Sequence, residues 1–176
     1  SARNGIQVIG FVKDTKFSTS RGFHDQPVTV EITSSTEGAE IWYTLDGSPP
    51  SIGMGYLYSV PIEISKTTIL RAAAYKLGFS PSNIDTQTYV FVDDVVKQPA
   101  NPVGFPAEWA GNPADYEMDP EVIGETDLFN GTYRESIKDD LKSLPVMSVV
   151  MAPEDLFGNS GIYDHPQGEG AIWEKP

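Results

Sequence analysis

The chain has 176 residues, 39% hydrophobic and 21% charged, enough for one domain of ordinary size or one domain with a partial second. Its 25 acidic and 12 basic residues give a net charge of −13, and we see no basic cluster of the kind that nucleic-acid binders use. No membrane span or signal peptide is predicted, and without cysteine there is no disulfide, thiolate zinc site or cysteine nucleophile.

Residues 26–92 have the pattern of an antiparallel β-sandwich, and we expect a lead-in strand in residues 1–25. Alternating hydrophobic and polar residues predict half-buried strands, which we place at 28–33, 41–45, 62–64, 67–75 and about 83–92. Turns rich in Gly, Pro and Asp separate them about every ten residues, a spacing typical of a sandwich. Small alanines on one face of 67–75 indicate that a second sheet approaches closely.

The most recognisable turn is Asp46-Gly47-Ser48, which two prolines follow. Gly47 can adopt a positive φ, and the Asp46 carboxylate can accept backbone N–H groups within the turn. We therefore interpret this motif as structural.

Residues 93–133 are predicted to form an irregular acidic connector. Residues 93–140 carry 12 acidic and 3 basic side chains, whereas residues 1–92 carry 8 and 7. Large apolar groups are frequent in the connector, namely Phe105, Trp109, Tyr116, Met118, Phe129 and Tyr133. A solvated linker would not hold so many of them, so we expect an ordered segment packed on its neighbours.

Residues 134–176 are predicted to form a short C-terminal α/β piece. The pattern favours a helix over 134–143, a strand over 146–151 and a helical turn over 153–157. Because the strand is apolar on both faces, we expect it to be covered on both sides. It would pair within the chain or with a second copy, through Val146, Val149 and Val150.

Two segments resemble known families. GAEIWYTLDGSPP at 38–50, the residues at 58–62 and KTTILRAAAY at 66–75 resemble the chitobiase/β-hexosaminidase C-terminal-type module, also called fibronectin-III-associated. The resemblance covers about residues 26–92. It implies an immunoglobulin-like sandwich appended to secreted bacterial enzymes, and thus a secreted or cell-surface location.

The second resemblance lies further along the chain. LPVMSVV at 144–150, PEDLF at 153–157, GIY at 161–163 and WEKP at 173–176 resemble the opening of CotH (spore-coat-protein-H) kinase-like domains. ADYEMDP at 114–120 resembles the connector of exported proteins that carry both modules. The chain stops where such a domain has barely begun, so we expect a truncated piece without the family's nucleotide-binding and catalytic residues.

No catalytic constellation can be assembled from the sequence. His24 and His165 both lie in turn-like contexts, and no Gly-x-Ser-x-Gly elbow is present. The run at 168–170, Gly-Glu-Gly, is too short for a phosphate loop and carries an acid where phosphate would approach. We therefore expect no catalysis and no nucleotide cofactor.

Two sets of residues are candidates for binding. Trp42, Tyr56 and Tyr58 could form an aromatic platform for sugars, unless Trp42 is covered by the connector or another strand. Three carboxylates at alternate positions, Asp115, Glu117 and Asp119, could hold calcium in an irregular loop. The alternative is that Asp119 caps a short helix begun by the following proline, while the other two are solvated or paired.

The sequence favours a non-catalytic structural or adhesive module of a larger exported protein, which spaces or orients a CotH-like or surface-binding neighbour. Its partners would be other domains of that protein and a glycan or cell-surface ligand, but no nucleic acid. Two alternatives stay open: the N-terminal part of a CotH-like kinase, active only in a longer chain, and a carbohydrate-binding accessory module.

Overall fold

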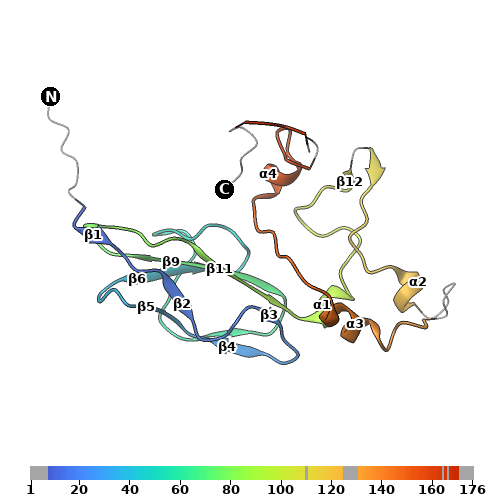
Figure 1. Ribbon diagram of the computed structural model, residues 1–176, viewed down its shortest axis with the longest axis horizontal. Helices are drawn as coiled ribbons and strands as arrows, with labels where there is room; N and C mark the ends of the chain where they lie inside the picture. Colours follow the sequence, from blue (N-terminus) through green and yellow to red (C-terminus); the bar gives the residue numbers. More distant parts are fainter. Residues whose placement is uncertain (1–7, 110, 125–130, 164, 166, 171–176) are drawn as a thin grey trace. The chain divides into compact units, whose positions relative to one another are not determined.

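The computed structural model describes residues 8–109, 111–124, 131–163, 165 and 167–170. The chain divides into two compact units, Ser1–Val90 and Phe91–Pro176. The fold is mainly β with predominantly antiparallel pairing, as predicted (Figure 1). The N-terminal unit contains β1 (Gly10–Phe11), β2 (Thr15–Phe17), β3 (Gly22–Phe23), β4 (Val28–Val30), β5 (Ile32–Ser34), β6 (Glu40–Thr44), β7 (Tyr56–Leu57), β8 (Ile62–Ile64), β9 (Thr68–Tyr75), β10 (Phe79–Ser80) and β11 (Asp85–Val90). The C-terminal unit contains α1 (Val92–Val95), β12 (Glu108–Trp109), β13 (Asn112–Pro113), α2 (Pro120–Ile123), α3 (Ile137–Ser143) and α4 (Pro153–Phe157).

A five-stranded sheet in the order β3-β11-β9-β6-β7 forms one layer of the sandwich. Its centre is β9, which pairs antiparallel with both β6 and β11. The second layer consists of the two strand pairs β2-β5 and β4-β8. Thr15 of β2 joins the layers, because its Oγ1 donates to Oδ2 of Asp85 in β11 over 2.6 Å.

The single strand predicted at 28–33 is two strands in different pairs. β4 pairs with β8, and β5 pairs with β2. Val30 and Ile32 are both buried, so the alternation of buried and exposed residues continues through Glu31 although the pairing partner changes. The hydrophobic pattern is therefore that of one strand, while the chain passes from one sheet to another.

Both faces of β9 are covered. Ala72 and Ala74 on the inner face and Ala73 on the outer face are fully buried. On the outer face, the Arg71 guanidinium donates to the carbonyl of Gly47 over 3.0 Å, and the Tyr75 hydroxyl donates to the carbonyl of Pro50 over 2.8 Å. The segment that follows β6 therefore lies over the outer face of the sheet.

The C-terminal unit packs around aromatic rings. The ring of Trp109 lies 4.9 Å from that of Tyr116 and 5.9 Å from that of Tyr163, centre to centre. Phe105 and Phe157 extend this cluster, with their ring centres 6.1 Å apart. The contacts join residues 105–116 of the predicted connector to residues 157–163, so these two segments pack on each other. Phe129, expected to take part, lies outside the described residues.

Three elements differ from what the sequence predicts. Val92, expected at the end of a strand, begins α1, and α3 starts at Ile137 instead of residue 134. The strand expected at 146–151 is not formed: Val149 is 64% exposed, and no strand in the described residues pairs with this segment. An apolar run cannot build a ladder without a neighbouring strand that offers backbone donors and acceptors. The predicted helical turn at 153–157 is confirmed as α4.

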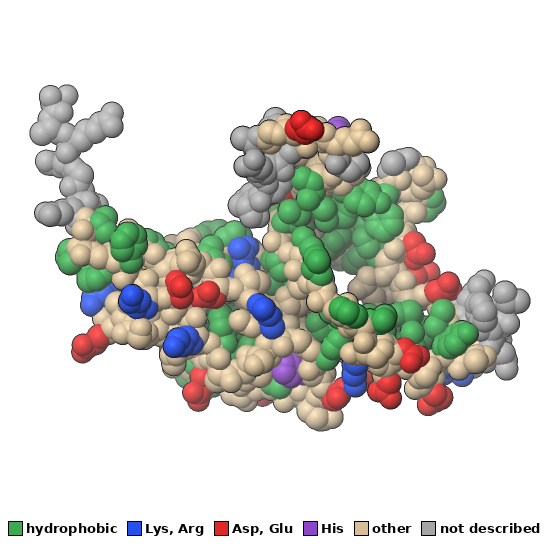
Figure 2. Space-filling view, viewed as in Figure 1, with side chains coloured by type: hydrophobic (Ala, Val, Ile, Leu, Met, Phe, Trp, Pro, Cys, Tyr) green, Lys and Arg blue, Asp and Glu red, His purple; other side chains and the backbone are tan. Residues whose placement is uncertain are grey.

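Hydrophobic side chains also gather on the visible surface of the C-terminal unit (Figure 2). Those that are exposed on the segment between α3 and α4 are Leu144, Val146, Met147 and Val149. Within the described ranges, no helix has the length and apolar character to cross a bilayer.

Candidate functional site: a groove at one end of the sandwich

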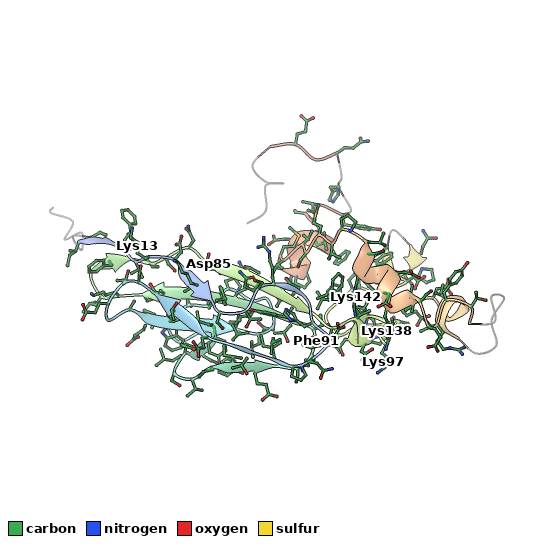
Figure 3. All side chains as sticks on the ribbon, turned by 60° about the horizontal axis from the view of Figure 1, so that its bottom comes forward. Lys13, Asp85, Phe91, Lys97, Lys138 and Lys142 are labelled. Atoms are coloured by element: carbon green, nitrogen blue, oxygen red, sulfur yellow. The ribbon has the colours of Figure 1, made fainter. Side chains whose placement is uncertain are left out.

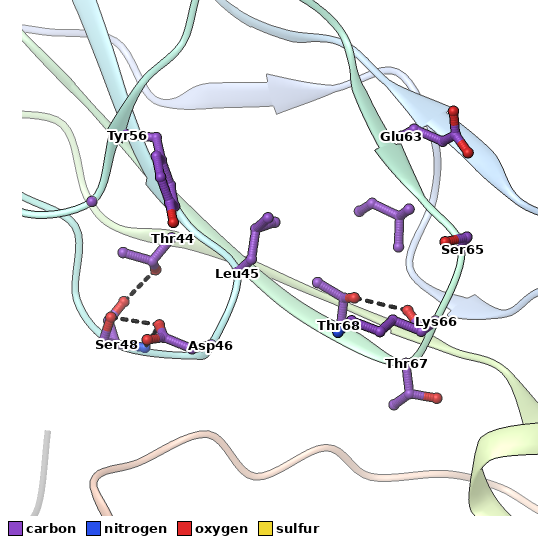
Figure 4. A pocket seen from close by; sticks show the side chains of 12 residues that line it. Thr44, Leu45, Asp46, Ser48, Tyr56, Glu63, Ser65, Lys66, Thr67 and Thr68 are labelled. Atoms are coloured by element: carbon purple, nitrogen blue, oxygen red, sulfur yellow. Dashed lines mark hydrogen bonds between the residues drawn. The ribbon is translucent and has the colours of Figure 1, made fainter.

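A groove of about 660 Å³ lies within the N-terminal unit, where the two layers of the sandwich meet. One wall comes from the turn after β6 and the start of β7, and the other from the end of β8 and the segment leading to β9 (Figure 4). Its lining is mixed in character: Tyr56 is aromatic, Leu45 and Ile64 are aliphatic, and the polar side chains include Asp46, Ser48, Glu63, Ser65, Lys66 and Thr67.

The turn Asp46-Gly47-Ser48 shapes one wall. The backbone N–H and the hydroxyl of Ser48 both donate to Oδ1 of Asp46, over 3.0 and 2.6 Å. The hydroxyl bond, followed by the backbone bond, lowers the pKa of the Asp46 carboxyl. Gly47 has a φ of 81°, which a glycine adopts without strain. The Asp46 carboxylate is therefore held in a fixed position at the rim of the groove.

Three tyrosines gather beside the groove. The ring centre of Tyr43 lies 5.5 Å from that of Tyr56 and 6.3 Å from that of Tyr58. Burial, followed by the proximity of Tyr56 and Tyr58, raises the pKa of the Tyr43 hydroxyl. The structure thus brings together two of the three predicted aromatic residues and adds Tyr43, which the sequence pattern had placed on an inward face with Ile41. Only the pairing of Tyr43 with Tyr56 across β6 and β7 reveals this role.

Trp42, the third predicted platform residue, lies on the opposite face of β6. Successive side chains of a strand point to opposite faces, and Trp42 pairs with Leu57 instead of Tyr56. Trp42 is half-buried, and its Nε1 is buried without a hydrogen-bond partner among the described residues. This is the face that the segment after β6 covers. Trp42 therefore does not contribute to the tyrosine cluster.

Gly55 allows Tyr56 to reach its position. Its φ is 99°, in the region that favours glycine. A Cβ at this position would also overlap the carbonyl oxygen of Tyr43. The backbone of β7 can therefore pass close to β6 only with glycine here, and this approach places the Tyr56 ring against that of Tyr43.

The three carboxylates proposed for calcium are exposed in the C-terminal unit. Asp115, Glu117 and Asp119 lie on an irregular segment before α2. The main-chain carbonyl of Asp119 accepts the N–H of Val122 over 2.9 Å, which opens the helix. Across the described residues, no group of three or more His, Asp or Glu side chains is placed to hold a metal ion.

Each histidine contacts a main-chain carbonyl. His24 Nε2 lies 3.0 Å from the oxygen of Ser20, and His165 Nε2 lies 3.0 Å from that of Asn159. The two residues belong to different units. These contacts are typical of polar residues that fix a turn.

The C-terminal unit also contains a charged group in which three lysines, labelled in Figure 3, act on the carboxylate of Asp93. Lys138 of α3 forms an ion pair with Asp93 of α1. The hydrogen bond with Lys138, together with the charges of Lys138, Lys97 and Lys142, lowers the pKa of Asp93. The ion pair between Asp93 and Lys138 therefore connects α1 and α3.

Comparison with known proteins adds a family match for the sandwich. Residues 30–89 match the family described as Fn3 associated. The matched segment runs from the end of β4 to β11 and includes the groove and the three tyrosines. The fold and this match define the class: the sandwich is similar to Fn3-associated modules, which supports the first resemblance of the sequence. Neither the curated proteins nor the solved structures gave a match to the chain.

Proposed function

We propose that the N-terminal unit is a non-catalytic accessory module that spaces and orients neighbouring domains of a larger exported protein. The similarity to Fn3-associated modules supports an accessory role. The spacing role rests on one observation, the position at which the chain enters and leaves this unit.

The chain enters and leaves at opposite ends of β9. β1 pairs with β10, just after the Tyr75 end of β9, whereas Tyr89, at the end of β11, pairs with Thr68 at the other end. A strand of eight residues rises about 3.3 Å per residue, which separates these points by roughly 25 Å. The same arrangement is visible within this unit in Figure 1, where β1 and the end of β11 lie at opposite ends of the sandwich. A module with this arrangement keeps whatever precedes it apart from whatever follows.

The polar side chains inside the sandwich support a rigid spacer. Asp85 accepts both the N–H and the hydroxyl of Thr15, and the Tyr89 hydroxyl donates to the carbonyl of Thr19 over 3.0 Å. These bonds connect residues about 70 positions apart in the chain. They fix β2 and the residues just after it to β11, and so oppose relative movement of the two ends of the sandwich.

The test measures the distance between the two ends in solution. The chain has no cysteine, so spin labels can be placed at Ile9→Cys and Gln26→Cys, both of which are exposed. Ile9 precedes β1, and Gln26 follows β3, which pairs with the end of β11. We expect one narrow distance distribution by pulsed electron paramagnetic resonance. Ile9→Cys with Leu77→Cys is the control at a single end and should give a much shorter distance. A broad or multimodal distribution for the first pair would contradict the spacer role.

We propose a CotH-like domain as the neighbour on the C-terminal side, and a secreted or cell-surface location for the protein. The support is the resemblance of residues 144–163 to the opening of such domains, and α4 forms the helical turn expected there. The kinase alternative makes a different prediction for the same chain. Calorimetry with ATP and Mg²⁺ should show no saturable binding, and micromolar binding would favour the enzyme alternative over the accessory role.

A further inference from the structure

We propose that the groove beside Tyr56 binds a neutral glycan chain, with one pyranose ring stacked on the exposed face of Tyr56. This inference does not depend on the spacing role, because a rigid spacer needs no ligand. It rests on the position of one tyrosine, the polar groups across from it and the charge of the groove.

Tyr56 is exposed yet held in place. It is 61% exposed, although one side of its ring faces Tyr43 at 5.5 Å. Gly55 lets the backbone before Tyr56 pass close to β6, where a larger residue would overlap the carbonyl oxygen of Tyr43. A side chain that is already ordered loses little conformational entropy when a ligand binds. The sugar ring offers a flat face of C–H groups, which suits the negative face of an aromatic ring.

Polar side chains on both walls of the groove could pair with the hydroxyl groups of a stacked sugar. Glu63, Ser65 and Lys66 are exposed on the wall across from Tyr56 (Figure 4). Asp46 stands on the near wall, with its carboxylate oriented by Ser48. Carboxylates accept hydrogen bonds, the ammonium group donates them and the serine hydroxyl does both. The groove can therefore pair with sugar hydroxyls that act as donors and with those that act as acceptors. An apolar surface with a few oriented polar groups is the usual composition of a small-molecule site, and 660 Å³ lies within the usual range of about 300–1,000 Å³.

The charge of the groove selects against acidic glycans. Asp46 and Glu63 contribute two negative charges, and Lys66 contributes one positive charge. The N-terminal unit as a whole is nearly neutral, since residues 1–92 carry 8 acidic and 7 basic side chains. An anionic polysaccharide would therefore meet repulsion mainly at the groove itself. A neutral chain meets none.

The experiment is an NMR titration of the full-length ¹⁵N-labelled chain with neutral hexasaccharides. The probes are cellohexaose, xylohexaose, chitohexaose and maltohexaose, and oligogalacturonate is the acidic comparison. We expect at least one neutral probe to bind with a dissociation constant below about 1 mM and to shift the amides of residues 44–48, 55–56 and 63–68. Failure of all four to bind, shifts confined to other residues, or preferential binding of the acidic probe would overturn the proposal.

Variants separate stacking from a general effect on the fold. Tyr56→Ala should weaken binding at least tenfold, whereas Tyr56→Phe, which keeps the ring, should stay within about threefold of the parent. Leu57→Ala is the matched control, because Leu57 is exposed on the same strand, does not line the groove and should leave affinity unchanged. Glu63→Ala, on the facing wall, should weaken binding severalfold without altering the melting temperature. Equal affinities of Tyr56→Ala and Leu57→Ala would exclude stacking at this site, whatever the result for the spacer distance.

Discussion

The two units of the chain are stabilised in different ways. In the N-terminal unit, aliphatic side chains from both layers are fully buried, among them Val30 and Leu70. In the C-terminal unit, the aromatic rings that pack on one another stay partly exposed, such as Phe105 and Tyr163. A β-sandwich restrains its residues through ladders between segments distant in sequence, whereas a ring cluster has few such restraints. We therefore expect the N-terminal unit to be the more stable of the two.

The largest expected effect is the loss of a core side chain from the sandwich. Leu70 is 0% exposed at the centre of β9, and Leu70→Ala should reduce the free energy of unfolding of the N-terminal unit by about 2–5 kcal/mol because it leaves a cavity. Leu77→Ala is the control: Leu77 is 99% exposed, and its loss should cost no more than about 0.5 kcal/mol. Chemical denaturation measures both. Similar losses for the two variants would mean that β9 is not the centre of the core.

A second effect should appear at alkaline pH in the same unit. Burial raises the pKa of Tyr89 to about 12, whereas an unfolded tyrosine ionises near pH 10. As the pH rises, the unfolded state releases the proton first. The stability that the neutral Tyr89 side chain contributes is therefore complete below about pH 10 and is lost as the pH rises toward 12. The loss should reach about 2 kcal/mol. Urea unfolding at pH 9 and pH 11.5 measures it.

Tyr89→Phe supplies the comparison for the pH effect. The variant lacks the hydroxyl that donates to Thr19, so it should be less stable at pH 9 but should lose less further stability between pH 9 and 11.5. The same pH dependence in parent and variant would show that other groups cause it.

The C-terminal unit should respond to a change in its ring cluster while the sandwich stays unchanged. Trp109 contacts Tyr116 and Tyr163, and its Nε1 donates to the Tyr116 hydroxyl over 3.0 Å. Trp109→Ala should destabilise this unit by about 1–3 kcal/mol, from lost ring contacts and one lost hydrogen bond. Near-ultraviolet circular dichroism reports on the rings. Val103→Ala, at a fully exposed position of the same unit, should leave the spectrum intact.

The smallest effect concerns the segment for which the sequence predicted a buried strand. Val149 is exposed in the chain, so Val149→Asp should change the melting temperature little, within about 0.5 kcal/mol of stability. Light scattering on the same samples tests the association between copies that the sequence predicts. A drop in mass for the variant would show that this segment mediates self-association, and a large loss of stability would contradict its exposure.

Much of the sandwich could be predicted from sequence because each strand carries its own alternation of buried and exposed residues. Ile62 and Ile64 are buried on β8 as the pattern required, and so are Leu70, Ala72 and Ala74 on β9. The alternation does not show which strand is the partner. It continues through Glu31, where the chain changes sheets, and no local signal marks that change.

The candidate site was predictable only in part for the same reason. Tyr56 and Tyr58 were recognisable as aromatic residues in a turn-rich region, but their contact with Tyr43 depends on the register between β6 and β7. For Trp42, the phase of the strand indicates only that the side chain faces away from the inner layer. That phase does not show that the segment after β6 returns to cover the outer face.

Native-state hydrogen exchange of the full chain tests the central claim, that the sandwich is a self-contained rigid body, most directly. The amides of β6, β9 and β11 should be the best protected and should share one free energy of opening, because these strands form the centre of one sheet. Residues 105–116 and 157–163 should open separately at a lower free energy, and Trp109→Ala should lower the protection of those residues alone. One shared opening free energy for both units, or a loss of protection in β9 when Trp109 is removed, would contradict the account.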